Sequence, residues 1–473
     1  MSRPYPTLPA LPLICVLGLT ACGQSENAED NFALYCSACH GERLEGGSAP
    51  SMLDDEWTYG GTDEDITRLI TEGALETGMP AWGTVLSDAE IRALVVFIRE
   101  RRQGYQRYRD TLPAPQSSLP FSSEQHAFRM ETVIEDIDSP WSINWLPDGT
   151  MVVTEKSGAL RLHRNGELSP AIMDTPWVDA GGQGGLLEVA PHPDYADNGW
   201  IYLTFSHPTQ NSRGGNVSFT KIVRGRIHDQ TWVDEEVIYE ANVDHYRNPG
   251  GPHYGSRIAF DDDGHLFFSI GDRGARQQAQ DLTRPNGKIH RLMLDGSIPA
   301  DNPFARDSRA LPSIWSYGHR NPQGLDFDPR NGTLWDTEHG PRGGDELNLV
   351  VPGNNYGWPV ITYGMNYNGT PITSETAREG MEQPIIHWTP SIAVCGIDFY
   401  EGDQFPAWQN NLFVTALAQQ HLRRVVIENN RVIHQEVLFE DFGRCRDVAS
   451  GPDGYIYVAL NRPDRVVRLV PAD

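Results

Sequence analysis

Two parts of this chain combine residue types and spacings that suit chemistry. Residues 36–40 read Cys-Ser-Ala-Cys-His, the spacing of c-type haem attachment, in which two thioethers hold the porphyrin and the histidine binds the iron. Residues 251–260 place His253 and an arginine among glycines, directly before a predicted strand. A neutral histidine near pH 7 is a natural general base for a hydroxyl proton. The two parts therefore predict one electron-transfer centre and one proton-accepting centre.

The haem motif has the sequence context that such a centre requires. Met79 lies in Gly-Met-Pro some forty residues after Cys36 and Cys39, and its sulphur can bind the iron opposite His40, which raises the potential and suits electron transfer. Met52 is the competing sulphur, in a run typical of a structural loop. The alternative is a redox CxxC followed by a chance histidine, which the helical context disfavours.

A capped amphipathic helix is predicted to close this first region. Ser87 and Glu90 form a capping box, and the apolar residues that follow repeat at helical spacing. Those residues are Ile91, Leu94, Val95 and Ile98. Two further short helices are expected at 32–35 and 66–70. Over its full length, residues 23–105, the region resembles a small class I cytochrome c, with haem c as its cofactor.

Composition limits the partners of the chain. Its 473 residues are enough for more than one domain. Its 39% hydrophobic and 22% charged residues are ordinary for a folded protein, and its formal net charge is -26. The acidic balance argues against nucleic acid, because a phosphate backbone selects basic surfaces. It fits a small neutral ligand but names none.

The N-terminus is interpreted as an export signal. Arg3 precedes an apolar stretch at 11–19, and Leu-Thr-Ala-Cys at 19–22 resembles a bacterial lipoprotein box in which Cys22 is lipidated. The alternative is an ordinary secretory signal. Residues 1–22 therefore predict a periplasmic protein held at a membrane by a lipid anchor. Cys395 and Cys445 either pair in that oxidising compartment or are buried thiols, and the sequence leaves both open.

Residues 126–473 repeat one unit six times, after a polar, proline-bearing linker at 106–125. Each unit is an apolar strand, a turn with Pro, Asp or Gly, and another apolar strand. The first strands are expected at 142–145, 187–189, 257–260, 324–327, 396–399 and 447–450. Six copies at irregular spacing predict a six-bladed β-propeller. The fold class is therefore an all-β six-bladed propeller with a small N-terminal all-α cytochrome c domain.

The phase of the repeat brings polar side chains together. Residues just before the first strand and just after the second lie at the same end of each hairpin. The polar residues in these positions are Gln183, His253, Asp272, Arg273, Arg320, Asn321, Glu338, His339, Arg444 and Arg446. They should meet at one mouth of the central channel. Polar groups that converge on a concavity are a candidate site. Because the six predicted blades contain no thiolate cluster and no dinucleotide fingerprint, the electrons that reach the haem should come from a bound organic redox cofactor.

The motifs of this region resemble the soluble PQQ-dependent glucose dehydrogenase and aldose sugar dehydrogenase family. They cover nearly all of 126–473 and occur in the order of that family. The motifs lie at residues 182–187 (GQGGLL), 318–324 (GHRNPQG), 345–348 (DELN), 355–359 (NYGWP) and 444–447 (RCRD).

This resemblance implies roles for the mouth residues. His253 matches the base that takes the anomeric hydroxyl proton of an aldose, whose hydride passes to PQQ to give an aldonolactone. Arg320 and Asn321 match residues that contact the quinone oxygens, where an arginine stabilises negative charge. Gln183 matches a polar wall of the sugar site.

The resemblance also implies metal sites. The main-chain carbonyls of Gly340 and Pro341 match those that hold the Ca²⁺ beside PQQ, and carbonyl oxygens are ligands that Ca²⁺ accepts. Glu346 and Tyr356 match ligands of a second, structural Ca²⁺.

Two departures from the family concern the cofactor and the sugar. Arg444 and Arg446 match the arginines that grip PQQ, but the family's cofactor-binding lysine falls at about Ala418. Arg273 is the candidate replacement. Pro252 stands where the glucose enzyme has an acidic residue before the base, so a preference for glucose does not follow.

The sequence therefore predicts a quinohaemoprotein that oxidises aldoses and passes electrons through its own haem to a respiratory acceptor, a cytochrome or an oxidase. One alternative is a Ca²⁺-dependent propeller lactonase, in which the haem would have no purpose. The other is a propeller that binds or senses sugar without catalysis. Both alternatives predict no binding of PQQ.

Overall fold

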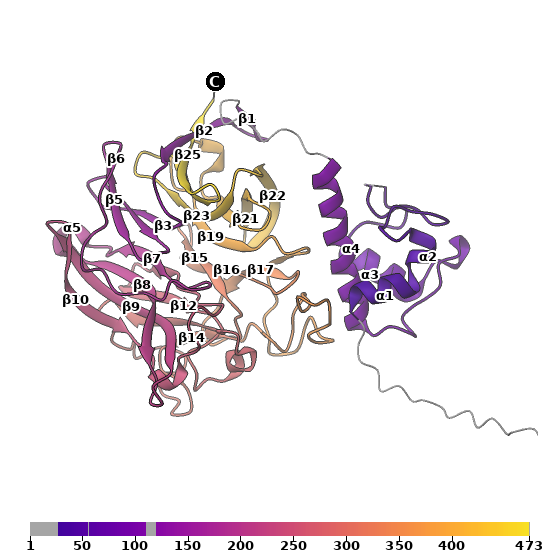
Figure 1. Cartoon of the computed structure of the whole chain (residues 1–473), viewed down its shortest axis with the longest axis horizontal. Coiled ribbons are helices and arrows are strands. Elements are labelled where there is room, and N and C mark those ends of the chain that lie inside the picture. The colour runs from indigo at the N-terminus through magenta and orange to yellow at the C-terminus, as the bar shows by residue number, and fades with distance from the viewer. Residues whose placement is uncertain (1–26, 55, 110–119, 473) are drawn as a thin grey trace, which may run out of the picture.

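The computed structural model describes residues 27–54, 56–109 and 120–472 of the 473-residue chain. A small helical domain lies beside a large ring of strands (Figure 1). The signal segment, the lipidation candidate Cys22 and residues 110–119 of the predicted linker lie outside these residues. Among the helices within them, none is both long and apolar enough to cross a membrane.

The N-terminal domain is helical, as predicted. Its elements are α1 (Ala28–Tyr35), α2 (Ser37–His40), α3 (Asp63–Glu72), η1 (Leu75–Thr77) and α4 (Asp88–Arg109). Thr62 and Asp65 form a reciprocal capping box at the start of α3, and Ser87 and Glu90 exchange the same hydrogen bonds before α4. The apolar faces of α1, α3 and α4 share one buried cluster that contains Phe32, so burial fixes these helices against one another.

The remaining chain forms six antiparallel sheets arranged as the blades of a propeller (Figure 1). The first three are β3 (Pro140–Trp145), β4 (Met151–Glu155), β5 (Leu160–Arg164) and β6 (Glu167–Leu168); β7 (Leu186–Pro191), β8 (Ile201–Gln210), β9 (Asn216–His228) and β10 (Thr231–Tyr239); and β11 (Ile258–Phe260), β12 (His265–Ile270), β13 (Lys288–Met293) and β14 (Ile314–Tyr317). Short helices α5 (Tyr195–Asn198), η2 (Val243–His245) and η3 (Arg276–Gln280) lie in their connections.

The last three blades follow the same plan. They are β15 (Pro322–Asp328), β16 (Thr333–Glu338), β17 (Asp345–Val350) and β18 (Ile386–Trp388); β19 (Val394–Phe399), β20 (Leu412–Ala416), β21 (His421–Glu428) and β22 (Arg431–Phe439); and β23 (Arg444–Ser450), β24 (Ile456–Asn461) and β25 (Arg465–Pro471), with η4 (Pro406–Trp408) before β20. Each predicted first strand falls within a strand at one end of its sheet, except that Arg257 directly precedes β11. The six-fold prediction is therefore confirmed.

The ring closes by pairing the start of the propeller with its end. β2 (Ala127–Ile134) adds to the last blade with Met130 opposite Leu469, and β1 (Phe121–Ser122) lies outside it. The predicted linker at 106–125 is therefore structured at both ends, because α4 continues to Arg109 and β1 pairs with β2.

Contacts fix the cytochrome domain on the propeller through α4. Arg342 forms an ion pair with Glu100 of α4 at 2.6 Å, between Nη2 and Oε2. The Arg92 guanidinium donates to the carbonyls of Thr373 and Ser374 at 3.2 and 3.1 Å. Met365 of the propeller is buried in the same apolar cluster as the cytochrome helices. Figure 1 shows α4 between the propeller and α2, which carries the haem motif.

Candidate functional site

A half-buried histidine paired with a fully buried aspartate lies at the centre of the predicted mouth. His253 precedes β11 and Asp272 follows β12, and His253 Nδ1 lies 2.6 Å from Asp272 Oδ1. Burial lowers the pKa of His253, and the Arg320 charge lowers it further, against the opposing effect of Asp272. Burial alone would raise the pKa of Asp272, but hydrogen bonding and charge interaction with His253 hold it below its usual range. The pair is therefore a neutral imidazole supported by a carboxylate, which suits proton acceptance.

Close backbone approach produces this geometry. A Cβ on Gly271 would lie 2.5 Å from the carbonyl oxygen of His253, so only glycine lets the two loops cross here. His253 itself has φ of +60°, a conformation that costs a non-glycine residue energy and is frequent at functional sites. The Gln183 side chain accepts a hydrogen bond from His253 N at 2.7 Å, and Trp358 Nε1 donates to Asp272 Oδ2 at 2.8 Å. The predicted wall residue and a tryptophan thus hold the pair in place.

Arginines surround the pair. Arg320 donates from Nη1 to the carbonyls of His339 and Gly340, both at 2.8 Å. Charges on Arg320, Arg446 and Arg444 act with burial to lower the pKa of His339 well below its ordinary value, so these groups lie close together. The Nε2 atom of His339 and the Nε atom of Arg320 are buried without a hydrogen-bond partner in the described structure. Such a set of donors suits an anionic, oxygen-rich ligand.

Two further predicted residues serve the loops of the mouth. Asn321 is buried, and its side-chain oxygen accepts a hydrogen bond from Gly255 N at 3.1 Å. The Cζ atom of Arg273 lies 3.5 Å from the centre of the Tyr254 ring, and its guanidinium also donates to the main-chain carbonyl of Asn248. Its role as a replacement for the family lysine stays a prediction.

Lys156 is a cation that the sequence analysis missed. It follows β4 and donates from Nζ to the Ala180 carbonyl at 2.6 Å. Its pKa is lowered by burial and by the charge of Arg446, which places it near the arginines of the mouth. The repeat could have predicted this residue. Lys156 follows the second strand of the first blade, the same position in the repeat that Asp272 occupies in the third blade.

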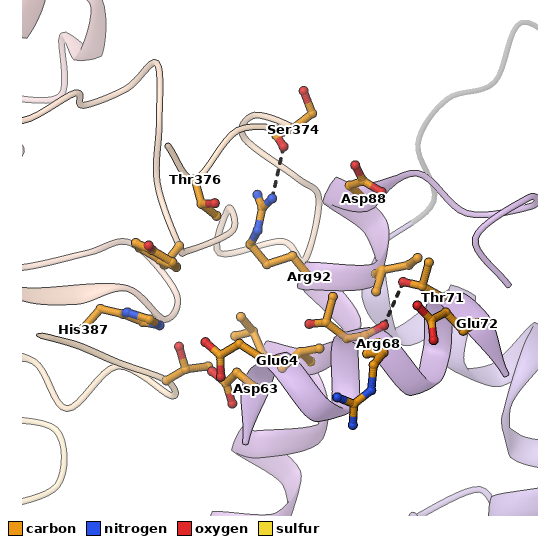
Figure 2. Close-up of a pocket in the computed structure, with 16 residues that line it drawn as sticks. Asp63, Glu64, Arg68, Thr71, Glu72, Asp88, Arg92, Ser374, Thr376 and His387 are labelled. Carbon is orange, nitrogen blue, oxygen red and sulfur yellow. Dashed lines mark hydrogen bonds between the residues drawn. The ribbon is translucent and has the colours of Figure 1, made fainter. Parts of the chain in front are cut away.

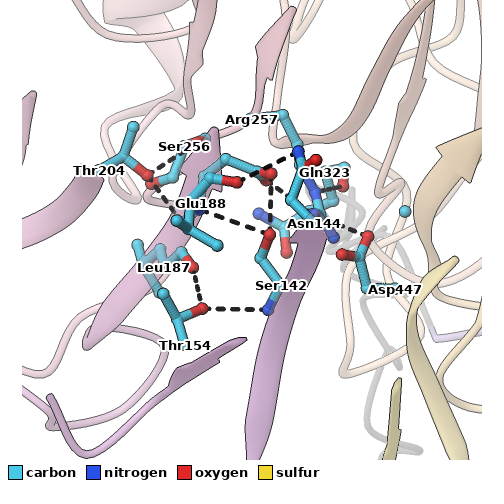
Figure 3. A network of polar contacts seen from close by, with 12 residues as sticks. Ser142, Asn144, Thr154, Leu187, Glu188, Thr204, Ser256, Arg257, Gln323 and Asp447 are labelled. Atoms are coloured by element: carbon cyan, nitrogen blue, oxygen red, sulfur yellow. Dashed lines mark hydrogen bonds and ion pairs between the residues drawn. The ribbon is translucent and has the colours of Figure 1, made fainter. Parts of the chain in front are cut away.

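A polar network forms the floor beneath the mouth (Figure 3). Arg257 donates from Nη1 to Glu188 at 2.7 Å and to Asp447 at 2.8 Å, and from Nε to the Gln323 carbonyl at 2.7 Å. Ser142 donates to the other oxygen of Glu188 at 2.9 Å. The inner ends of five blades are thereby tied to one buried guanidinium. The floor that carries Arg446 is consequently rigid.

The two remaining cysteines are thiols in the structure. Cys395 and Cys445 are both buried and free, and Arg446 Nη1 lies 3.4 Å from Cys395 Sγ. Of the two alternatives, a disulfide or buried thiols, the structure therefore has buried thiols. Cys395 belongs to the floor, and Cys445 to the apolar cluster of the last blade.

A buried acidic cluster lies beside the mouth, on the fourth blade. Ligand atoms of His319, Asp336 and Glu338 lie within 4.8 Å of one another. Asp336 and Glu338 are two apart on β16, so both point to one face, and neither oxygen of Asp336 has a hydrogen-bond partner in the part of the chain described. Burial, with the charge of Glu338, raises the pKa values of Asp336 and Glu346 well above normal. Uncompensated buried carboxylates suit a hard cation.

The predicted metal-site residues lie at this cluster. Glu338, Glu346 and Tyr356 line one small cavity with Gly340. The Tyr356 hydroxyl donates to the Leu349 carbonyl at 2.5 Å, which leaves its main chain rather than its phenol for a cation. Arg320 occupies one lone pair of the Gly340 carbonyl, and a second remains for a metal. Asp336 and His319 also belong to this group and were not predicted from the sequence.

The haem motif is arranged for attachment. Cys36 directly precedes α2 and Cys39 lies within it; both are free thiols, and Cys39 is exposed. His40 Nδ1 lies 3.2 Å from the Pro50 carbonyl, and burial lowers its pKa, so its other nitrogen is a neutral ligand for iron. Met52 and Met79 both pack against the apolar cluster of the domain. These residues fit a haem, and the choice of Met79 stays a prediction.

A cavity of about 510 Å³ lies between the two domains (Figure 2). Helices α3 and α4 line one side, and the 363–389 region of the propeller lines the other. Tyr363 and His387 stack there with ring centroids 3.8 Å apart. Burial lowers the pKa of His387, against the raising effect of Asp63 and Glu64 on α3. The domains are therefore in contact through α4, with this cavity beside the contact.

Comparison with known proteins agrees with the two-domain architecture. Residues 137–468 match the family model for glucose/sorbosone dehydrogenase, and residues 23–98 match that of the cbb3-type cytochrome c oxidase subunit III. Aldose sugar dehydrogenase YliI of Escherichia coli is 40% identical over 336 residues, 70% of this chain and 89% of that protein. Quinoprotein glucose dehydrogenase B of Acinetobacter calcoaceticus is 27% identical over 415 residues, 70% of this chain and 85% of that protein.

Solved structures show the same propeller. The PQQ-bound form of an aldose sugar dehydrogenase from Streptomyces coelicolor superposes with a TM-score of 0.59 at 26% identity, and covers 73% of this chain and 98% of that chain. Fold, site and relatives together define a sugar dehydrogenase propeller joined to a c-type cytochrome domain. The chain belongs to the glucose/sorbosone dehydrogenase family.

Proposed function

We propose that the protein is a quinohaemoprotein that oxidises the anomeric carbon of aldose sugars to aldonolactones and passes the electrons through its own haem to a respiratory acceptor. The observation that carries this proposal is the His253–Asp272 pair, which has a hydrogen-bond distance of 2.6 Å and lies among arginines in a propeller of the sugar dehydrogenase family. The fused cytochrome domain supports the electron route.

The chain's own residues would handle protons and charge. His253 accepts the anomeric hydroxyl proton, and Asp272 stabilises the imidazolium that results. Hydrogen bonds to the carbonyls of His339 and Gly340 hold the Arg320 guanidinium at the mouth. Its positive charge would stabilise the negative charge that develops there. Gln183 holds the main chain of His253, which keeps the base in position.

The residues of the mouth fit PQQ. Arg320, Arg444 and Arg446 would hold its quinone and carboxylate oxygens, with Lys156 as an added cation nearby. When bound, PQQ supplies a two-electron acceptor for the hydride of the sugar. Calcium would sit at the carbonyls of Gly340 and Pro341.

The second calcium would occupy the acidic cluster, and this predicts a stability effect. Asp336→Asn should remove most of the rise in Tm that Ca²⁺ gives the wild-type protein, and should raise the stability of the metal-free protein, because it removes an uncompensated buried carboxylate. Calcium at a hundred times its Kd would stabilise the wild type by about 2.7 kcal/mol. Thermal unfolding with Ca²⁺ and with a chelator measures both. The exposed Asp262→Asn is the control, and an equal Ca²⁺ response in Asp336→Asn contradicts the assignment.

The interdomain ion pair predicts a second effect, on electron transfer. Glu100→Gln should weaken docking of α4 on the propeller by about 1 kcal/mol and so slow haem reduction by sugar, because it removes a bidentate partner of Arg342. Stopped-flow absorbance of the haem measures this rate. Glu131→Gln breaks a comparable pair with Arg468, at 2.9 Å within the propeller, and should leave the rate unchanged. Equal rates in all three proteins would contradict a role for the docked contact.

Export and membrane attachment complete the proposal. Cleavage before Cys22 and its lipidation would place the enzyme at the periplasmic face of a bacterial membrane, near respiratory acceptors. Mass spectrometry of the mature N-terminus tests this part independently of catalysis.

The function as a whole is tested optically. Oxidised protein is loaded with PQQ and Ca²⁺, aldoses are added, and the reduced-haem band is followed. Haem reduction that requires both sugar and PQQ is the expected result. Reduction of a small acceptor without haem reduction would retain the dehydrogenase and remove the relay. No reduction of any acceptor would favour a lactonase or a sugar-binding propeller.

A further inference from the structure

The loop that carries His253 lies against a neighbouring loop of the mouth with no room for a side chain between them. We call residues 248–254 the base loop, and residues 179–183 are its neighbour. A Cβ on Gly182 would lie 1.8 Å from the Gly250 carbonyl oxygen. The φ of His253 is +60°, a conformation that a non-glycine residue rarely adopts. Such a conformation persists only where surrounding groups hold it, so the contacts of the base loop decide where the base points.

Asp179 anchors the middle of the base loop. Its Oδ2 atom accepts hydrogen bonds from Gly250 N at 2.7 Å and from the Tyr254 hydroxyl at 3.2 Å. The Ser218 hydroxyl donates to the same oxygen at 2.8 Å. Burial alone would raise the pKa of Asp179, but the hydrogen bonds from Gly250 and Ser218 hold it below its ordinary value. The anchor is therefore a carboxylate with its acceptor positions filled by the mouth loops.

The base loop wraps around the guanidinium of Arg273. Only 4% of this residue is exposed. Its Nη1 atom donates to the Pro252 carbonyl, and its Nη2 atom donates to the Asn248 carbonyl at 3.4 Å. Its Cζ atom lies 3.5 Å from the centre of the Tyr254 ring, which is a cation–π contact. A Cβ on Gly251 would lie 3.2 Å from Nη1, so the loop leaves little space around the charge.

Arg273 directly follows Asp272, the partner of the base. Asp272 Oδ1 lies 2.6 Å from His253 Nδ1, while Arg273 binds the carbonyl of Pro252, the residue immediately before His253. Two consecutive residues therefore hold both the imidazole and the main chain of the base. A catalytic group that is misplaced by about 1 Å can lose a large part of its effect. The main-chain contact is thus as important to the alignment as the side-chain contact.

We propose that Arg273 is a positioning residue for the base, which holds the base loop so that His253 stays aligned with Asp272, and that it does not hold the cofactor. This inference rests on the proposed function. Both terminal nitrogens of Arg273 donate to carbonyls of the base loop, and Tyr254 covers one face of the guanidinium. A lysine keeps the charge but has no planar fork that binds two carbonyls and stacks on a ring.

The experiment compares Arg273→Lys and Arg273→Gln with the wild type, each as the full-length enzyme loaded with PQQ and Ca²⁺. With a small acceptor, kcat and kcat/KM for an aldose should fall together by about 10–100-fold in both variants, because the base is no longer aligned in the transition state. The Kd for PQQ, titrated by fluorescence, should be unchanged. Tyr254→Leu removes the ring on which Arg273 stacks and should produce the same pattern if either arginine variant fails to fold.

Arg291→Lys is the matched control. Arg291 is also a buried arginine of the third blade, its Cζ atom lies 4.4 Å from the centre of the Trp315 ring, and its Nε atom donates to Asn302 at 2.6 Å. It has the same kinds of contact as Arg273 but lies in β13 rather than beside the base. Its replacement should leave kcat and the Kd for PQQ unchanged.

The pH dependence separates the charge of Arg273 from its geometry. Burial, Arg320 and Arg273 lower the pKa of His253, and Asp272 raises it. The nearby His339 is neutral, because burial and the surrounding arginines hold its pKa well below normal. Arg273→Gln removes a positive charge, so the inflection of kcat/KM should move to higher pH. Arg273→Lys keeps the charge and should leave the inflection closer to that of the wild type.

Hydrogen exchange tests the position of the base loop without turnover. The amides of Gly250 and His253 donate to Asp179 and Gln183, so a peptide that spans 248–254 should exchange faster in Arg273→Lys than in the wild type or Arg291→Lys. If the wild type shows no sugar oxidation, the proposed function fails, and the exchange rates still show whether Arg273 holds the loop. An unchanged kcat in Arg273→Lys, with or without faster exchange, would overturn the inference. A higher Kd for PQQ in Arg273→Lys would also overturn it, because Arg273 would then hold the cofactor.

Discussion

His253→Ala should lower kcat for aldose oxidation by about 10²–10⁴-fold, the usual contribution of a general base. The imidazole is the group that the mouth supplies for the anomeric proton, and its contact with Asp272 at 2.6 Å fixes its orientation. Binding of PQQ should persist, because the arginines that would hold it are untouched. Steady-state kinetics with a small acceptor gives kcat, and a titration with PQQ shows that the variant is loaded.

A matched control lies on the same blade. His265 contacts Asp261 at 2.8 Å, a similar histidine–aspartate pair at the opposite end of β12. His265→Ala should leave kcat unchanged. If His253→Ala keeps kcat within a few-fold of the wild type, the base has been assigned to the wrong residue.

The pH dependence of kcat/KM distinguishes a histidine that acts as a base from one with only a structural role. Burial and Arg320 lower the pKa of His253, so kcat/KM should rise with pH through an inflection below the ordinary histidine value and then stay level. The value of kcat/KM falls at low pH because protonated His253 can no longer accept a proton. Asp272 raises the pKa of His253, so Asp272→Asn should move the inflection to lower pH as well as reduce kcat. An unmoved inflection would place the titrating group elsewhere.

The repeat explains why much of this site could be predicted. The phase of the repeat puts His253, Arg320 and Arg446 at one end of their hairpins, and the structure brings them around His339. Blade architecture fixes which end of a strand faces the channel mouth, and this information is local in sequence. Lys156 obeys the same rule and could have been found by it.

Other features depend on distances that the sequence does not encode locally. Arg257 joins Glu188 and Asp447, which are 69 and 190 positions away in the chain, and only the closed ring makes them neighbours. His319 lies in the connection between the third and fourth blades, and its ligand atom comes within 4.8 Å of that of Asp336 on β16. Docking of α4 on the loop at Arg342 is a contact between surfaces, and neither surface alone predicts its partner.

Removal of the covalent haem should separate the two halves of the proposed reaction. Cys36→Ala/Cys39→Ala deletes both thiols of the attachment motif, so no thioether can form. Sugar-driven reduction of a small neutral quinone should continue near the wild-type rate, because His253 and the arginines of the mouth are unchanged. Reduction of a protein acceptor should be lost, because its electrons would come from the haem. The two assays, run on the same preparation, measure both outcomes.

The axial ligand gives a version of this test that keeps the cytochrome domain assembled around its haem. Met79→Ala retains Cys36, Cys39 and His40, so the haem stays attached, but loss of the thioether ligand should lower the reduction potential. Haem reduction by sugar should then be less complete at equilibrium. Met52→Ala is the matched control, because Met52 packs against the same cluster. If the reduction potential falls in Met52→Ala and not in Met79→Ala, the ligand assignment is reversed. If the double cysteine variant still reduces the protein acceptor, the electrons bypass the haem.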